Sequence, residues 1–250
     1  MKRLILYIFI LIFGFGFAQT PESLFNKANA AYKKGDYQNA ISLYEKALQS
    51  GKVAPEIYFN LGNAYYKSNR IAPSIYYYEK ALKLKPGDED IRYNLQLANQ
   101  MKLDKIEKVP ENILLRIKKR INRIFNYDTW AWIAVISAIA GFLIFGLFLF
   151  TKQANTKRLA FVGMFISLFL LIFAWYNADF GYRLSQVKYG IVFNPKTELM
   201  TEPNLTSDVV ISLHEGSKVQ VLKNDGDWYL VKLPDGKKAW LPKEDVRVIK

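Results

Sequence analysis

The residues that could carry out chemistry are few in this chain. It contains no cysteine and a single histidine, His214, so a thiolate nucleophile, a disulfide and a thiolate zinc site are excluded. One histidine without cysteine builds neither a metal site nor a catalytic triad, and its place beside the Glu215-Gly216 turn predicts a surface loop residue. The sequence has no phosphate-binding loop. It therefore predicts no enzymatic activity and no cofactor or metal, which leaves binding surfaces as the chemistry to look for.

Aromatic, asparagine and lysine side chains recur in the N-terminal half at a spacing of 34 residues. The segment EKAL at 45–48 recurs at 79–82, and the small residues Ala28 and Gly62 occupy equivalent positions where paired helices would approach closely. A period of 34 with these spacings resembles the tetratricopeptide repeat. We expect an all-α array of two repeats over residues 21–109, closed by a capping helix at 88–107.

In that family, a groove formed by the first helix of each repeat binds extended peptides or other proteins. The resemblance implies that the matching positions bind a partner here: Phe25, Asn29, Tyr32, Lys33, Phe59, Asn63, Tyr66 and Lys67. The alternative is that these aromatic side chains only pack repeat on repeat. Asn29 and Asn60 match the asparagines of relatives that clamp a terminal carboxylate. Phe25, Asp90 and Asn94 replace the required cations, so we expect no such clamp.

Two apolar runs divide the chain, because residues 130–150 and 159–176 carry no charge. As helices they would span about 31 Å and about 27 Å, and the hydrocarbon core of a bilayer is about 30 Å thick. The basic connector at 151–158 is long enough to join antiparallel helices and little else. We expect a transmembrane α-hairpin that places residues 1–128 and 177–250 on the same side. A buried hairpin of a soluble protein is the alternative.

Basic and aromatic side chains flank these runs. The segment 111–128 has the pattern of a basic amphipathic helix that lies in the lipid interface, although it could also be a solvated linker helix packed on the repeats. The residues expected at the membrane interface are Arg116, Lys118, Lys119, Arg120, Arg123, Trp130, Trp132 and Trp175. Residues 190–250 carry nine basic and nine acidic side chains, so the net charge of +13 lies elsewhere, largely beside the apolar segments. This distribution favours contact with the lipid bilayer and not with nucleic acid.

The N-terminus has the layout of a secretory signal peptide over residues 1–18. Lys2 and Arg3 precede an apolar run at 4–17, and small residues stand at the cleavage positions. An uncleaved anchor is the alternative. The basic residues before the hairpin outnumber those in the connector, which taken alone would place the repeats in the cytoplasm. Because the first translocation signal usually dominates, we expect a two-pass protein of the bacterial inner membrane with both soluble domains periplasmic and the connector cytoplasmic.

From residue 190 the pattern changes to short apolar runs broken by turns. Asn224-Asp225-Gly226 and Pro234-Asp235-Gly236 are hairpin-type turns. Strands are expected at 198–200, 209–211, 218–222, 228–233 and 238–241. So many short strands in a segment of this length imply a small all-β barrel at 190–250.

The barrel segment resembles the bacterial SH3-like domain through the Glu215-Gly216 turn, Trp228, Gly236 and Trp240. In that family the domain binds peptides or peptidoglycan, and aromatic side chains line the groove. The resemblance implies that the partner-binding residues are Trp228, Tyr229 and Trp240, although Trp228 could instead belong to the core.

The order of the parts, from signal peptide through repeats and hairpin to SH3-like barrel, resembles the BatE-like proteins of bacterial Bat aerotolerance operons. The resemblance covers nearly the whole chain and implies partners among membrane proteins with von Willebrand A domains and a MoxR-type ATPase. We therefore expect a multidomain membrane protein that acts as an inner-membrane adaptor or scaffold for other membrane or periplasmic proteins. The alternatives are a cell-wall tether that binds peptidoglycan and a regulatory subunit of a membrane enzyme complex.

Overall fold

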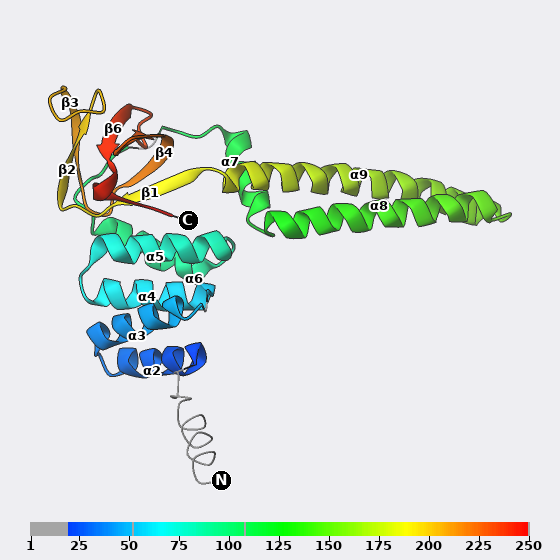
Figure 1. Cartoon of the computed structure of the whole chain (residues 1–250). Helices are drawn as coiled ribbons and strands as arrows, with labels where there is room; N and C mark the ends of the chain where they lie inside the picture. Colours follow the sequence, from blue (N-terminus) through cyan, green and yellow to red (C-terminus); the bar gives the residue numbers. More distant parts are fainter. Residues whose placement is uncertain (1–19, 52, 108, 250) are drawn as a thin grey trace, which may run out of the picture.

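The computed structural model describes residues 20–51, 53–107 and 109–249. The predicted signal peptide at 1–18 lies outside this part of the chain. Figure 1 shows a stack of short helices, a twisted sheet at one end of the stack, and a long helical hairpin that projects to one side. The expected fold class is confirmed: a helical repeat region, two long apolar helices and a C-terminal antiparallel all-β domain.

The stack consists of two antiparallel helix pairs and a fifth helix. Its elements are α2 (Pro21–Lys33), α3 (Tyr37–Gln49), α4 (Pro55–Lys67), α5 (Ile71–Leu84) and α6 (Glu89–Gln100). The turn inside each pair needs a left-handed residue, which is Gly35 (φ 81°) in the first pair and Asn69 (φ 55°) in the second. Gly62 lets α5 approach α4, because a Cβ there would lie 2.7 Å from the buried ring of Tyr78.

The capping helix is shorter than the predicted 88–107. Helix α6 ends at Gln100, and the described residues between it and α7 (Ile113–Asn122) form no helix or strand. The physical reason is a competing set of contacts: the side chains of Asp104 and Ile106 are held by the C-terminal sheet. A helix that ran through these residues would lose those contacts.

The hairpin consists of α8 (Tyr127–Phe150) and α9 (Ala154–Ser185), both long and apolar enough to cross a membrane. The predicted connector at 151–158 was too long, since only residues 151–153 separate the helices. The predicted helix at 111–128 is also two elements, because α7 ends at Asn122 and α8 already begins at Tyr127. Where α8 and α9 cross, the Ser167 hydroxyl donates to the Ser137 carbonyl oxygen at 2.5 Å.

The C-terminal domain is one seven-stranded antiparallel sheet in the order β3-β2-β6-β5-β4-β1-β7. Its strands are β1 (Lys188–Val192), β2 (Lys196–Met200), β3 (Val209–His214), β4 (Lys218–Asp225), β5 (Trp228–Lys232), β6 (Lys238–Pro242) and β7 (Val246–Val248). The sequence did not predict β1 and β7, and the domain begins at Lys188 and not at residue 190. A buried cluster that includes Leu199, Leu213, Val231 and Leu241 forms its core.

Candidate binding surfaces

The predicted groove residues lie on α2 and α4, the first helices of the two repeats. Phe25 packs its ring against Tyr44 at 5.9 Å between centroids, and Phe59 packs against Tyr78 at 6.0 Å. These phenylalanines, Tyr32 and Tyr66 are all half-buried against the repeat cores. Each ring therefore contributes to packing and is also partly exposed. Among the eight predicted positions, only Lys33 and Lys67 are exposed.

The asparagines of this set join one helix to the next. The Tyr44 hydroxyl donates to Asn29 Oδ1 at 2.6 Å, and the Asn60 side-chain amide donates to the same oxygen at 3.0 Å. Tyr78 and Asn94 make the equivalent bonds to Asn63 Oδ1, at 2.6 Å and 2.9 Å. Both asparagine oxygens thus accept two internal hydrogen bonds, which stabilise the stacking of successive helices. Burial raises the pKa of Tyr44 to about 12, so this donor stays protonated at neutral pH.

The sheet packs directly on the repeat array, against the second helix of the second repeat. The Tyr76 ring of α5 meets the Phe193 ring edge-on at 5.7 Å, and its hydroxyl donates to the Val248 carbonyl oxygen at 3.4 Å. Lys218 forms an ion pair with Glu79 of α5 at 2.7 Å. Ile191 of β1 and Ile249, which follows β7, belong to the same buried cluster as Ile75 and Tyr78. The two soluble domains therefore form one packed unit.

Asp104, in the segment between α6 and α7, makes a further contact with the C-terminal domain. Its carboxylate accepts hydrogen bonds from the His214 backbone N–H at 2.6 Å and from the Ser217 hydroxyl at 2.5 Å. The His214 ring Nδ1 lies 2.8 Å from the same carboxylate. Burial alone would raise the pKa of Asp104, but these hydrogen bonds outweigh it and lower the pKa below its ordinary value.

The prediction that His214 is a surface loop residue was wrong. His214 ends strand β3, is half-buried and contacts Asp104. The cluster of Asp104, His214 and Ser217 was not predicted from the sequence. Asp104 lies 110 residues before His214 and 113 before Ser217, and the three residues match no motif. Within the described residues, no group of three or more histidine or acidic side chains is placed to hold a metal ion.

The three predicted aromatic residues of the SH3-like domain do not share one face. Side chains alternate along a strand, and Tyr229 packs with Val231 against the core. Trp228 and Trp240 therefore lie on the opposite face of the β5–β6 ribbon, where Trp240 is paired in register with Leu230. Both tryptophans are half-buried. They form an outer aromatic surface to which Tyr229 does not contribute.

The residues expected at the membrane interface gather at the base of the hairpin. Arg116, Arg120, Arg123, Trp132 and Trp175 are exposed, and Lys118 and Lys119 are half-buried. Trp130, in contrast, is only 7% exposed, because it packs between Phe125 and Phe173.

Helix α7 lies across this base and is fixed to α9. The Lys118 ammonium lies 5.2 Å from the centroid of the Tyr176 ring, and the Asn122 side chain donates to the Asn177 carbonyl oxygen at 2.7 Å. The apolar side chains Ile113 and Leu114 nevertheless remain exposed. The amphipathic helix is therefore packed on the hairpin, and part of its apolar surface stays exposed.

A cleft of about 820 Å³ lies where the three parts of the molecule meet. Its walls come from the end of α5, the beginning of α8, the α9–β1 junction, strand β4, Tyr229 of β5, and Val248 and Ile249 at the C-terminal end. The charged residues that line it are Lys83, Asp128, Lys188 and Lys223. Leu84 and Leu222 add exposed apolar surface. This mixed lining suits a polypeptide or an amphiphilic molecule. Of the predicted binding residues, only Tyr229 lines it.

Two family models match the chain. A model described as tetratricopeptide repeat covers residues 25–89, and one described as bacterial SH3 domain covers residues 199–247. This chain carries tetratricopeptide repeats and a bacterial SH3 domain. Both are typically non-catalytic modules that imply interactions with proteins or with the cell wall. A comparison with curated proteins gives no match.

We predict that Asp104→Asn weakens the junction between the SH3 domain and the repeats. Loss of the charged acceptor should lower the free energy of unfolding by about 1–3 kcal/mol at neutral pH. Because the pKa of Asp104 is lowered in the folded state, its contribution is full above the ordinary aspartate pKa and disappears as the pH falls through the folded value. Thermal unfolding of the full chain in detergent, measured from pH 7 down to about 3, should show the wild type and variant converging in acid.

Asp208→Asn serves as the control, since it removes an exposed carboxylate from the same domain. We expect a change within about 0.5 kcal/mol for it. Equal effects of the two substitutions, or a constant gap between wild type and Asp104→Asn at every pH, would contradict the proposed contribution of Asp104.

Proposed function

We propose that this protein is a membrane-anchored adaptor that presents its repeats and its SH3 domain, as one unit, to partner proteins at the bilayer surface. The observation that carries the proposal is the packing of the sheet on α5 and on the segment around Asp104. Neither of these carries the predicted groove residues, which belong to α2 and α4. The sheet therefore fixes the array in place through contacts that do not involve the face expected to bind partners.

The hairpin supplies the anchor in this proposal. Helices of 24 and 32 residues reach about 36 Å and about 48 Å, and large apolar side chains such as Phe142 (75% exposed) and Phe169 (66%) face outward. Such surfaces are stable in lipid and not in water. We place the protein in the bacterial inner membrane with both soluble domains periplasmic, on the strength of the N-terminal sequence pattern. The exposed apolar side chains of α7 suit an interfacial position.

The cleft at the junction gives partners a second place to bind. It opens beside the beginning of α8, so a segment that follows the transmembrane helix of a partner would reach it without leaving the membrane surface. The order of domains supports a finer proposal, in which the protein serves a complex of the Bat aerotolerance type. Its partners would then be the membrane proteins and the ATPase of that system.

A cell-wall tether is the second candidate, and one observation favours it. Trp228 and Trp240 lie together on the outer face of the β5–β6 ribbon, and aromatic surfaces of this kind bind sugar rings and peptides alike. Here the repeats would recruit an enzyme to the wall, or regulate one.

For the adaptor, we predict that partners contact the first helices of the repeats. A photo-crosslinking amino acid placed at Lys33 or Lys67, both exposed, should give discrete high-molecular-weight adducts in cells. The same probe at Gln49, exposed at the end of α3, is the control and should give few. Adducts of equal yield at all three positions, or none at Lys33 and Lys67, would exclude a partner in this groove.

The two candidates differ in their affinity for the wall. The adaptor proposal predicts that the full chain in detergent stays in the supernatant when it is mixed with purified sacculi. Sedimentation that is lost in Trp228→Ala/Trp240→Ala and kept in Val209→Ala, an exposed position on β3, would support the tether instead.

Orientation can be tested because the chain has no cysteine. We predict that an impermeant maleimide added to cells with a permeable outer membrane labels Ser50→Cys and Leu205→Cys, one exposed site in each soluble domain. Asn155→Cys, exposed at the tip of the hairpin, should react only after lysis. The opposite pattern would reverse the orientation, and labelling of only one soluble domain would exclude a two-pass hairpin.

A further inference from the structure

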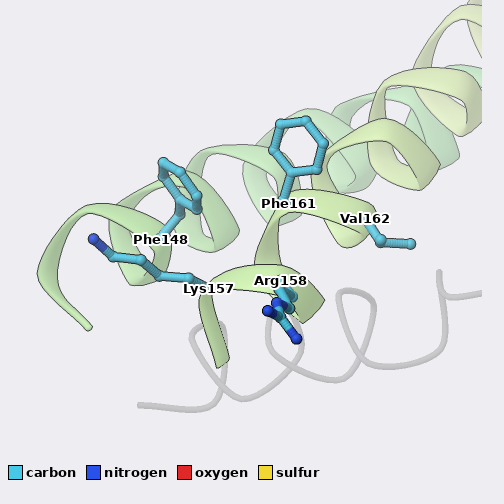
Figure 2. A pocket seen from close by; sticks show the side chains of 5 residues that line it. All are labelled: Phe148, Lys157, Arg158, Phe161 and Val162. Carbon is cyan, nitrogen blue, oxygen red and sulfur yellow. The ribbon is translucent and has the colours of Figure 1, made fainter. Parts of the chain in front are cut away.

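The tip of the hairpin carries a small hollow with an unusual lining. Its volume is about 360 Å³, and its walls are formed by Phe148 of α8 and by Lys157, Arg158, Phe161 and Val162 of α9 (Figure 2). Because α9 begins at Ala154, both cations stand on the first two turns of a regular helix and not on a loose connector. The helical backbone therefore fixes the points from which the two side chains extend.

The charge at this tip is uncompensated. Residues 129–178 contain no aspartate or glutamate, and the only charged side chains among them are Lys152, Lys157 and Arg158. The Lys157 ammonium lies 5.7 Å from the centroid of the Phe148 ring, which itself stands 6.4 Å from the Phe161 ring. Figure 2 shows Lys157 on the side of Phe148 and Arg158 extending from the same turn. A ligand here would be anionic.

The apolar walls of the hollow require that the ligand also has an apolar part. Phe161 and Val162 are 51% and 55% exposed, and they continue toward the apolar surface of α9. A free inorganic anion would gain nothing from such walls, whereas a lipid phosphate with attached acyl chains would contact both the cations and the apolar side chains. A zwitterionic headgroup would bring its own cation close to Lys157 and Arg158, which is unfavourable.

We propose that the tip of the hairpin binds the headgroup phosphate of one anionic phospholipid, with Lys157 and Arg158 on the phosphate and Phe161 and Val162 along the first part of an acyl chain. The inference rests on the proposed membrane insertion of the hairpin. It goes further because it assigns one lipid class to one site, at the end of the hairpin opposite to the soluble domains.

The experiment uses the full chain purified in a neutral detergent and titrated with phosphatidylglycerol or phosphatidylcholine, with bound lipid counted by native mass spectrometry. We expect the first phosphatidylglycerol to bind at least about tenfold more tightly than phosphatidylcholine, the scale of one hydrogen bond to a charged group. Excess inorganic phosphate in place of lipid should not bind and should not displace phosphatidylglycerol. Displacement would indicate an anion site without lipid recognition and would overturn the proposal.

Two variants distinguish lipid binding at the hollow from attraction by the total positive charge of the tip. Arg158→Gln should weaken the binding of phosphatidylglycerol by about tenfold or more. Arg158→Gln/Asn155→Arg restores the charge of the tip at an exposed position that does not line the hollow. We expect the double variant to remain weak. Recovery of wild-type affinity would show that only the total charge matters, and equal affinity for the two lipids would show that no anionic lipid is selected.

These outcomes are distinct from failure of the membrane proposal. If the chain is recovered from cells without detergent, the hairpin is not a membrane anchor, and both proposals fail. If the chain requires detergent but shows no preference among lipids, only the site at the tip is excluded. Thermal unfolding in detergent without added lipid, unchanged in both variants, shows that they are folded.

Discussion

The arrangement of this molecule depends on the contact between the edge of the sheet and helix α5. Tyr76, Glu79 and the buried isoleucines of both parts remove apolar surface from water and pair the charges at its border. Without this contact, the repeats and the SH3 domain would be two domains connected by the chain but not packed against each other. With it, the orientation of the helical array relative to the hairpin is set, because strand β1 continues almost directly from α9.

The carboxylate of Asp104 completes this constraint at one point. Three groups of the SH3 domain converge on it, and charge-assisted hydrogen bonds of this kind are stronger than neutral ones. The same contacts explain why the capping helix stops early, since the chain beyond Gln100 follows the surface of the sheet. The end of α6 at Gln100 is thus determined by contacts with residues more than 100 positions further along the chain.

The sequence predicted those features that depend on periodicity. The spacing of 34 residues and the two uncharged runs correctly indicated the repeats and the long apolar helices, and the turns at 224–226 and 234–236 correctly indicated a small all-β domain. It failed where the outcome depends on tertiary contacts. Strands β1 and β7 are five and three residues long, and they are identified by pairing with each other and with β4, which no local pattern reveals.

The candidate binding residues show the same limit. Helical spacing correctly placed the eight repeat positions on α2 and α4, but could not show that Asn29 and Asn63 already accept two internal hydrogen bonds each. Alternation along β5 is visible in the sequence and separates Tyr229 from Trp228, but the face of Trp240 follows only from the register between β5 and β6. The junction cleft could not be predicted from the sequence, because its walls come from segments that lie far apart along the chain.

One feature of α9 has a mechanical consequence. The helix continues from its last uncharged residue, Tyr176, to Ser185, and only two residues separate it from β1. A rod without a flexible hinge transmits rotation as well as position. A change in the tilt of the hairpin, whether caused by bilayer thickness or by a neighbouring protein, would therefore swing the sheet and the helical stack together, and so alter which surfaces face the membrane.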